Sequence, residues 1–429
     1  MFSLKNDYRI LRELAPDARL LFGTRIARLF AYGFLSVVLV LYLAERGLTE
    51  QRIGFLLTLT LVGDTAISLA LTTRADRFGR RWTLMAGAGL MVLAGVLFVF
   101  TGNFWLLLLA ATVGVLSPSG NEVGPFLPVE QAALTQELPT ERRTQVFAWY
   151  NLVGSFATAA GALAGGVLAR RLELAGFSSL DAYRVVLAGY ALMGLGLLAL
   201  FARLSPEVEV AARPAGGAKA PDATPGLSLG LGRSRGVIFR LSGLFFLDAF
   251  GGGFVIQSIV AYWFHVRFGL DTAALGTIFF GANLLAGISA LSAAWVARHL
   301  GLINTMVFTH LPSNVLLMLV PVMPSAGWAI AVLLLRFSIS QMDVPTRQSY
   351  TMAVVDPEER SAAAGVTGMA RTLGASSAPL FVGPLLANPA LMGGPFLIGG
   401  AIKIVYDLLL YRSFRSLKPP EETPSRAAR

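Results

Sequence analysis

Twelve long apolar stretches constrain the fold of this 429-residue chain more than any other feature. Each has the length of about 20 residues that an α-helix needs to cross the hydrocarbon core of a bilayer. Charged residues make up only 14% of the chain, against about 25% in ordinary soluble domains. The pattern predicts an all-α integral membrane protein with twelve transmembrane helices, and it argues against a soluble enzyme. The stretches lie at residues 20–44, 53–73, 82–101, 104–129, 144–169, 183–202, 238–266, 272–297, 302–322, 326–353, 361–388 and 392–411.

The composition excludes several kinds of chemistry. The chain has no cysteine, so disulfides, thiolate catalysis and cysteine-bound zinc or iron–sulfur clusters are excluded. It has three histidines, His265, His299 and His310, which makes a histidine-rich metal site improbable. We find no nucleophile elbow, no His-Glu-x-x-His pair and no ATP-binding P-loop. We therefore expect neither an enzyme nor a bound metal or cofactor.

The Lys and Arg residues divide unequally between the two sides of the membrane that the spans define. One side carries 23 of them and the other carries six. By the positive-inside rule, both termini and the long central loop are predicted to be cytoplasmic, in a plasma or inner membrane. Topology thus explains the net charge of +10, and we expect no nucleic-acid partner. The first apolar stretch is too long for the core of a cleavable signal peptide.

The chain divides into two halves around one polar stretch. Residues 205–236 are rich in Pro, Gly, Ala and charge and contain no apolar span. We therefore predict an N-terminal six-helix bundle over residues 1–204, a cytoplasmic linker over 205–236, a C-terminal six-helix bundle over 237–414 and a cytoplasmic tail over 415–429.

The two halves carry traces of an internal repeat. Gly54 recurs as Gly276 after a shift of 222 residues, and Gly166 recurs as Gly383 after a shift of 217. Matches at two similar shifts, in the same order, indicate duplication. Halves of this kind are parallel repeats related by an axis along the membrane normal, with a binding site between them near the midplane.

Thr49 and Asp271 stand at matching places in the two halves, where a turn enters a helix. Both residue types are good N-caps, because their side-chain oxygen accepts a hydrogen bond from an otherwise unpaired backbone N–H. This structural role accounts for both residues, and we assign them no function.

The connection between the second and third spans reads Ala75-Asp76-Arg77-Phe78-Gly79-Arg80-Arg81. It resembles the signature loop of the major facilitator superfamily, although Thr72 stands where the family usually has a glycine. The resemblance covers the whole chain and implies two pseudo-symmetric bundles that form a secondary transporter. It also implies a cytoplasmic gate, formed by Asp76, Arg77, Gly79, Arg80 and Arg81, that latches while the outside is open. The alternative for the arginines is that they only enforce topology.

A small-residue segment in span five bears on the direction of transport. Residues 161–166 read Gly-Ala-Leu-Ala-Gly-Gly, similar to a Gly-Pro-x-x-Gly-Gly segment of the family's antiporters, with Ala162 in place of the proline. The resemblance favours export. Close helix packing is an equally good explanation of these small residues.

Charged residues lie inside the predicted spans, six of each sign. An unpaired charge at the bilayer centre costs at least about 2.5–3.5 kcal/mol, so these groups should pair or face a wet cavity. Spacing of four along one helix predicts local pairs between Asp343 and Arg347 and between Lys403 and Asp407. Arg25 is close enough to the cytoplasmic end of its span to reach the headgroups. The basic residues are Arg25, Arg28, Arg336, Arg347, Arg371 and Lys403, and the acidic ones are Asp64, Glu122, Glu130, Asp248, Asp343 and Asp407.

Span four is the least regular, with three prolines and two glycines around Glu122 and Glu130. Broken helices beside charges are where transporters hold ions and substrates. Glu122 is therefore the first candidate for a proton carrier, followed by Asp248 and Asp64. The alternative for each is a structural ion pair with Arg28 or Arg371. We predict a cavity for proton and substrate lined by Arg28, Asp64, Glu122, Asp248, Gln257, Asp343 and Arg371.

Glu130 and Arg347 occupy matching places near the cytoplasmic ends of spans four and ten. A two-fold relation between the halves would bring them toward each other across the cavity. We predict that they form a salt bridge of the inner gate when the protein is open to the outside.

Together these features predict a secondary active transporter that works by alternating access, with proton-coupled efflux of a small organic molecule as its function. One alternative is an importer or facilitator of an organic anion, with the arginines binding substrate. Another is a lipid-handling membrane protein. One chain holds both halves of a cavity, so we expect a monomer in the lipid bilayer.

Overall fold

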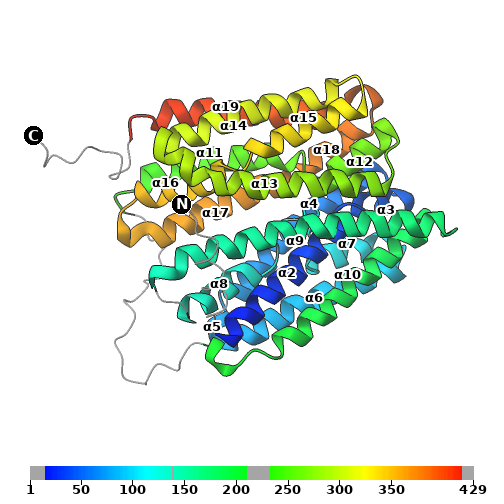
Figure 1. Cartoon of the computed structure of the whole chain (residues 1–429), viewed down its shortest axis with the longest axis horizontal. Coiled ribbons are helices and arrows are strands. Elements are labelled where there is room, and N and C mark those ends of the chain that lie inside the picture. The colour runs from blue at the N-terminus through cyan, green and yellow to red at the C-terminus, as the bar shows by residue number, and fades with distance from the viewer. Residues whose placement is uncertain (1–14, 138–139, 210–231, 418–429) are drawn as a thin grey trace, which may run out of the picture.

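The computed structural model describes residues 15–137, 140–209 and 232–417, and these are helical apart from turns and connecting loops (Figure 1). Residues 1–14 of the predicted N-terminal bundle, the middle of the predicted linker and most of the predicted tail lie outside the described residues. So do the side chains of Glu141, Arg142 and Arg143, at the connection after span four.

The first half contains nine helices within the described residues. They are α2 (Pro16–Ser36), α3 (Leu39–Glu45), α4 (Glu50–Thr72), α5 (Ala75–Phe78), α6 (Arg80–Phe100), α7 (Phe104–Val113), α8 (Phe126–Glu137), α9 (Thr140–Leu174) and α10 (Ser179–Phe201). A short 3₁₀ turn, Pro206–Val208, follows α10.

The second half contains another nine in its described part. They are α11 (Arg235–Gly253), α12 (Gln257–Phe268), α13 (Thr272–Leu300), α14 (Leu302–Leu319), α15 (Ala326–Ile339), α16 (Asp343–Ala353), α17 (Arg360–Ser377), α18 (Pro379–Leu386) and α19 (Gly394–Phe414). Three 3₁₀ turns, at Val320–Val322, Pro357–Glu359 and Pro389–Leu391, lie between them.

These helices make twelve membrane crossings, as the sequence predicts. Ten segments of the described residues are long and apolar enough to cross a membrane on length and composition alone. The other two crossings are broken ones: α7 and α8 share the fourth, with residues 114–125 between them, and α17 and α18 share the eleventh. The all-α fold of two six-helix bundles is confirmed. Figure 1 shows α2–α10 forming one bundle beside α11–α19.

The halves meet most closely at one end of the molecule, which we call the closed end. A Cβ placed on Gly54 of α4 would lie 2.5 Å from the carbonyl oxygen of Pro379, next to Gly383. A Cβ on Gly166 of α9 would lie 2.9 Å from the Cα of Gly276 in α13. Only glycine allows backbones to approach so closely. The internal repeat matches Gly54 with Gly276 and Gly166 with Gly383. The two-fold relation therefore converts the contact of α4 with α18 into the contact of α13 with α9.

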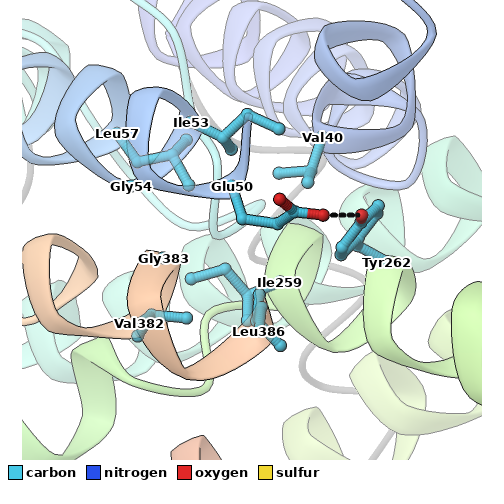
Figure 2. Close-up of a pocket in the computed structure, with 10 residues that line it drawn as sticks. All are labelled: Val40, Glu50, Ile53, Gly54, Leu57, Ile259, Tyr262, Val382, Gly383 and Leu386. Atoms are coloured by element: carbon cyan, nitrogen blue, oxygen red, sulfur yellow. Dashed lines mark hydrogen bonds between the residues drawn. The ribbon is translucent and has the colours of Figure 1, made fainter. Parts of the chain in front are cut away.

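Polar contacts reinforce the closed end. Tyr262 of α12 donates a hydrogen bond of 3.0 Å to Glu50 of α4. Figure 2 shows this pair in a small pocket whose other lining side chains, from α3, α4, α12 and α18, are apolar. Arg170 of α9 forms an ion pair of 3.2 Å with Asp271 at the start of α13. Both contacts join the first half to the second.

The N-caps predicted at Thr49 and Asp271 are confirmed, since their side chains accept hydrogen bonds from Arg52 N–H and Ala274 N–H. The sequence analysis missed the second role of Asp271. Its other carboxylate oxygen makes the cross-half pair with Arg170, which spacing along the chain could not reveal.

The opposite end, which we call the motif end, carries the loop of residues 73–79 (Figure 1). The Asp76 side chain is 68% exposed there. A Cβ on Gly365 or Gly368 of α17 would meet no described atom within 4 Å. The described residues therefore join the halves at the closed end and leave α17 open at the motif end.

Carboxylates tie both ends of the predicted linker to the bundles. Glu209 accepts hydrogen bonds from the backbone N–H groups of Arg80 and Arg81, at 2.6 and 3.1 Å, where α6 begins. Glu359 accepts from the N–H groups of Gly232 and Ser234, before α11. Each half thus holds one end of the linker by a carboxylate at a helix start, where unpaired N–H groups favour an anion.

We predict that Gly383→Leu opens the closed end, because the new side chain has no room beside the backbone of Glu50 and Gln51. Leu57→Cys serves as the reporter, since the chain has no other cysteine and Leu57 is buried at this end. Labelling of this cysteine by a membrane-impermeant maleimide should rise at least about tenfold, which corresponds to ~1.4 kcal/mol. The control is Gly196→Leu, at a glycine with open space around it. If Gly383→Leu and Gly196→Leu both fold and are labelled equally, the glycine contacts do not hold the closed end together.

Candidate proton and substrate site

Three interrupted helices meet at the centre of the molecule. The first crossing breaks after Ser36, the fourth breaks over residues 114–125, and the seventh breaks between Gly253 and Gln257. Glycine causes part of this irregularity: Gly120 and Gly124 have φ of +71° and +81°, a region that other residues rarely adopt. Interrupted helices leave backbone groups available for contacts inside the membrane.

The three breaks contact one another across the two halves. Gln257 donates a 2.7 Å hydrogen bond from its side chain to the hydroxyl of Ser36. The N–H of Ser258 donates to the carbonyl of Pro118 at 3.1 Å. Asn283 of α13 holds the amide oxygen of Gln257 at 3.0 Å. We call this set the junction; it places the predicted cavity residue Gln257 at a contact between the halves.

An N-terminal charge cluster lies beside the junction. Arg28 of α2 makes a bidentate pair with Glu130 of α8, at 2.6 and 2.7 Å. The Nε of Arg28 also donates to Glu122 at 2.8 Å. Arg25, one turn earlier, donates to the other oxygen of Glu122 at 2.8 Å. Tyr150 of α9 donates its hydroxyl proton to Glu130. The cluster balances two guanidinium groups with two carboxylates, as the membrane interior requires.

The two carboxylates of this cluster differ in access. The side chain of Glu130 is 0% exposed, and that of Glu122 is 18% exposed. Glu122 also lies on the non-helical segment 114–125, whose Pro118 contacts the other half. A proton can therefore reach Glu122 more easily than Glu130, and a change at Glu122 can reach the junction through a short segment of chain.

Two expectations for this region are wrong. Arg25 does not extend to the headgroups, because its guanidinium is held by Glu122, by the carbonyl of Tyr150 at 2.7 Å and by Asn151 at 3.1 Å. Asp64 has no ion pair among the described residues. It accepts a 2.7 Å hydrogen bond from the backbone N–H of Gly124 instead. The left-handed turn at Gly124 places that N–H, and the sequence alone could not reveal this.

A C-terminal charge cluster surrounds Asp248 of α11. Lys403 of α19 lies 2.5 Å from one carboxylate oxygen of Asp248. Arg371 of α17 and Arg347 of α16 lie 3.1 and 3.2 Å from the other. Arg347 also pairs with Asp343 at 2.7 Å, so the predicted local pair is confirmed. Three cations contact this one carboxylate, so Asp248 anchors the cluster.

The predicted local pair between Lys403 and Asp407 is wrong. Lys403 pairs with Asp248, and Asp407 pairs with His310 of α14 at 2.8 Å and with Asn314 at 2.9 Å. The sequence analysis missed His310 and Asn314 as members of a polar site. Their spacing of four along an apolar span was the one available signal, because it places both on one helix face.

Arg371 is the most accessible cation of this cluster. Its side chain is 35% exposed, and within the described part of the chain its one hydrogen bond goes to Asp248. A guanidinium held by one contact can bind a substrate anion with its remaining N–H groups.

The predicted gate residues are spread over three places. Glu130 and Arg347 lie in the clusters of their own halves, bonded to Arg28 and Asp343. At the motif end Asp76 pairs with Arg80 at 3.0 Å, and Arg80 also bonds Gln136 at 2.5 Å. Gly79 takes φ of +100° and so starts α6 beside Glu209. The side chain of Arg77 is exposed, and that of Arg81 is half-buried.

The fold and these clusters define a class, the multi-pass secondary transporter. The family model of the major facilitator superfamily matches residues 21–379. An uncharacterized membrane protein of Saccharomyces cerevisiae is 31% identical over 420 residues, which cover 92% of this chain and 93% of the yeast protein. This chain belongs to the major facilitator superfamily.

Solved structures share the fold at low sequence identity. A D-xylose–proton symporter has a TM-score of 0.70 at 16% identity and covers 92% of this chain and 97% of its own. The nucleoside transporter NupG has a TM-score of 0.69 at 12% identity, covering 94% and 100%. An inward-facing, unoccupied bacterial homologue of the human lysosomal transporter Spinster has a TM-score of 0.65 at 15% identity, covering 92% and 94%.

We predict that Glu130→Gln destabilises the protein more than Glu122→Gln does. Breaking a buried ion pair leaves an uncompensated charge, which costs about 3–5 kcal/mol, and Arg28 is buried with Glu130. Thermal unfolding of the purified variants in detergent measures the order of their Tm values. Glu207→Gln, on an exposed turn, is the control. A Tm for Glu130→Gln equal to that of the control would rule out the structural role of this pair.

Proposed function

We propose that this transporter exports a small organic molecule by alternating access, driven by protons that bind at Glu122. A monomer is sufficient, because one chain supplies both clusters and the whole junction. The two halves correspond to the predicted bundles of residues 1–204 and 237–414, which rock against each other about the junction.

The position of Glu122 carries this proposal. Its carboxylate accepts charge-assisted hydrogen bonds from Arg25 and Arg28, and protonation would weaken both. The same non-helical segment contacts Ser258 in the other half through Pro118. A proton on Glu122 would thus alter a contact between the halves. A ligand shifts such an equilibrium only if it binds the two states differently, and this connection provides the difference.

The positive-inside rule assigns the motif end to the cytoplasm of a plasma or inner membrane. In that orientation the structure represents the state that faces inward. The closed end is then the outer gate, and the loop of residues 75–81 belongs to the inner gate that forms when the outside opens.

The small-residue segment of span five supports the export direction by its resemblance to antiporters. The same residues also serve packing: a Cβ on Gly161 or Gly165 would lie 2.0 or 2.2 Å from a carbonyl oxygen of α2. Because the segment has both explanations, the transport experiment below also measures the direction of transport.

A second candidate is transport of an organic anion. Arg371 is 35% exposed with a single bond, and Arg336 of α15 has no ion pair among the described residues. Arg336 of α15 and Arg371 of α17 both lie in the second half. An anionic substrate would supply a partner for Arg336 and a further acceptor for Arg371.

The test uses purified protein in liposomes that contain a pH-sensitive dye, with a panel of candidate substrates that includes cations and organic anions. We predict that substrate triggers proton movement in the wild type. Glu122→Gln should lower it at least about tenfold, because Gln cannot carry the proton. The panel member that triggers it identifies the substrate class, and the sign of the proton movement gives the direction.

The control variant is Glu207→Gln, which should keep wild-type proton movement. Substrate flux without proton movement would replace the proposal with facilitated transport. Unchanged proton movement in Glu122→Gln would remove Glu122 as the carrier.

A further inference from the structure

The second half contains a buried polar group that the proposed mechanism does not use. His310 and Asn314 of α14 face Asp407 of α19, and all three side chains are buried. The Nδ1 of His310 lies 2.8 Å from Oδ1 of Asp407, and the Asn314 amide donates to Oδ2 at 2.9 Å. These groups lie on helices that do not contribute to the junction.

The hydrogen bonds define which nitrogen of His310 carries the proton. An ionised carboxylate only accepts hydrogen bonds, so Nδ1 of His310 carries the proton that lies between the ring and Asp407. Nε2 then has a lone pair. It accepts a 3.4 Å hydrogen bond from Nζ of Lys403 and lies 3.8 Å from Oδ1 of Asp248. The imidazole can bind one more proton at Nε2, on the side that faces the Asp248 cluster.

Three carboxylates and four basic side chains lie in the region of His310. Asp248, Asp343 and Asp407 stand against Lys403, Arg336, Arg347 and Arg371. Apolar and aromatic groups complete the surroundings, including the ring of Tyr406 at 5.9 Å. The charged and titratable groups that reach this region are Asp248 from α11, Arg336 from α15, Asp343 and Arg347 from α16, Arg371 from α17, and Lys403, Tyr406 and Asp407 from α19.

We propose that His310 and Asp407 form a second proton-binding site, separate from Glu122, which takes its proton at Nε2 of His310. No bond other than N–H forms, and the proton comes from water. The new Nε2–H faces Oδ1 of Asp248 and repels Lys403, which now holds that oxygen.

Protonation of this site would change the state of Arg371. Asp248 connects the two, since it contacts Lys403 through one oxygen and Arg371 through the other. An imidazolium that attracts Asp248 loosens the single bond that holds Arg371. The proton thus frees a guanidinium for a substrate anion, on a helix that packs against α4 of the other half. This role in transport rests on the proposed proton coupling, whereas the proton-binding site itself does not.

The direct test is NMR of the full chain in nanodiscs with ¹³C-labelled histidine. His265→Gln with His299→Gln leaves His310 as the single histidine. Spectra are recorded as the sample is acidified from about pH 8 to pH 5, and we expect the ring signals to change, because a proton added at Nε2 alters the ring. The change should persist in Glu122→Gln. Asp407→Asn should weaken it, because the imidazolium loses its anionic neighbour. Ring signals that stay constant over this range would overturn the proposal.

Substrate exchange between equal pools supplies the functional readout, because it needs no net proton movement. His310→Asn keeps an N–H donor toward Asp407 and cannot bind the second proton. The slope of log exchange rate against pH should fall by about one in this variant, since one proton fewer is bound. An unchanged pH profile in folded His310→Asn would overturn the role in transport.

The outcomes separate this site from the proposed function. Titration of His310 together with unaltered proton movement in Glu122→Gln would refute the proposed carrier and keep the second site. Loss of proton movement in Glu122→Gln, together with a His310 ring whose signals do not change with pH, would keep the proposed carrier and refute the second site.

Discussion

The cost of a charge inside the bilayer governs the interior of this transporter. An isolated ion there costs at least about 2.5–3.5 kcal/mol, and most of the interior charges of each half pair within its own helices. Arg25 and Arg28 balance Glu122 and Glu130 in the first half, and Asp248 contacts three cations in the second. Pairing within a half leaves the interface between halves free to change. The halves are joined instead by the close helix contacts at Gly54, Gly166, Gly276 and Gly383 and by the few polar contacts of the closed end.

The junction connects these charge clusters to that interface. Breaks in the first, fourth and seventh crossings bring Ser36, Pro118 and Gln257 together, and Glu122 lies on one of the broken segments. A regular helix would have satisfied its own backbone and offered no such contact. In the proposed mechanism a proton on Glu122 acts on this contact directly, because Glu122 and the contact belong to one short stretch of chain.

The fold could be predicted from the sequence because an apolar run of about 20 residues has one stable form in lipid, the helix. Local features could be predicted too, including the pair of Asp343 with Arg347 and the N-cap at Asp271. The partners of Lys403, Asp407 and Arg25 could not. Which charges meet depends on how helices far apart in the sequence pack. His310 escaped notice because a single histidine in an apolar span has no pattern until Asp407 is placed beside it.

The central claim is that neutralising Glu122 shifts the equilibrium between the two open states. Spin-label distances measure this directly, with one pair at the closed end, Leu174→Cys with Val266→Cys, and one at the motif end, Phe78→Cys with Leu300→Cys. We predict that acidification and Glu122→Gln each lengthen the closed-end distance and shorten the motif-end distance. Distances that respond to neither change would contradict the claim.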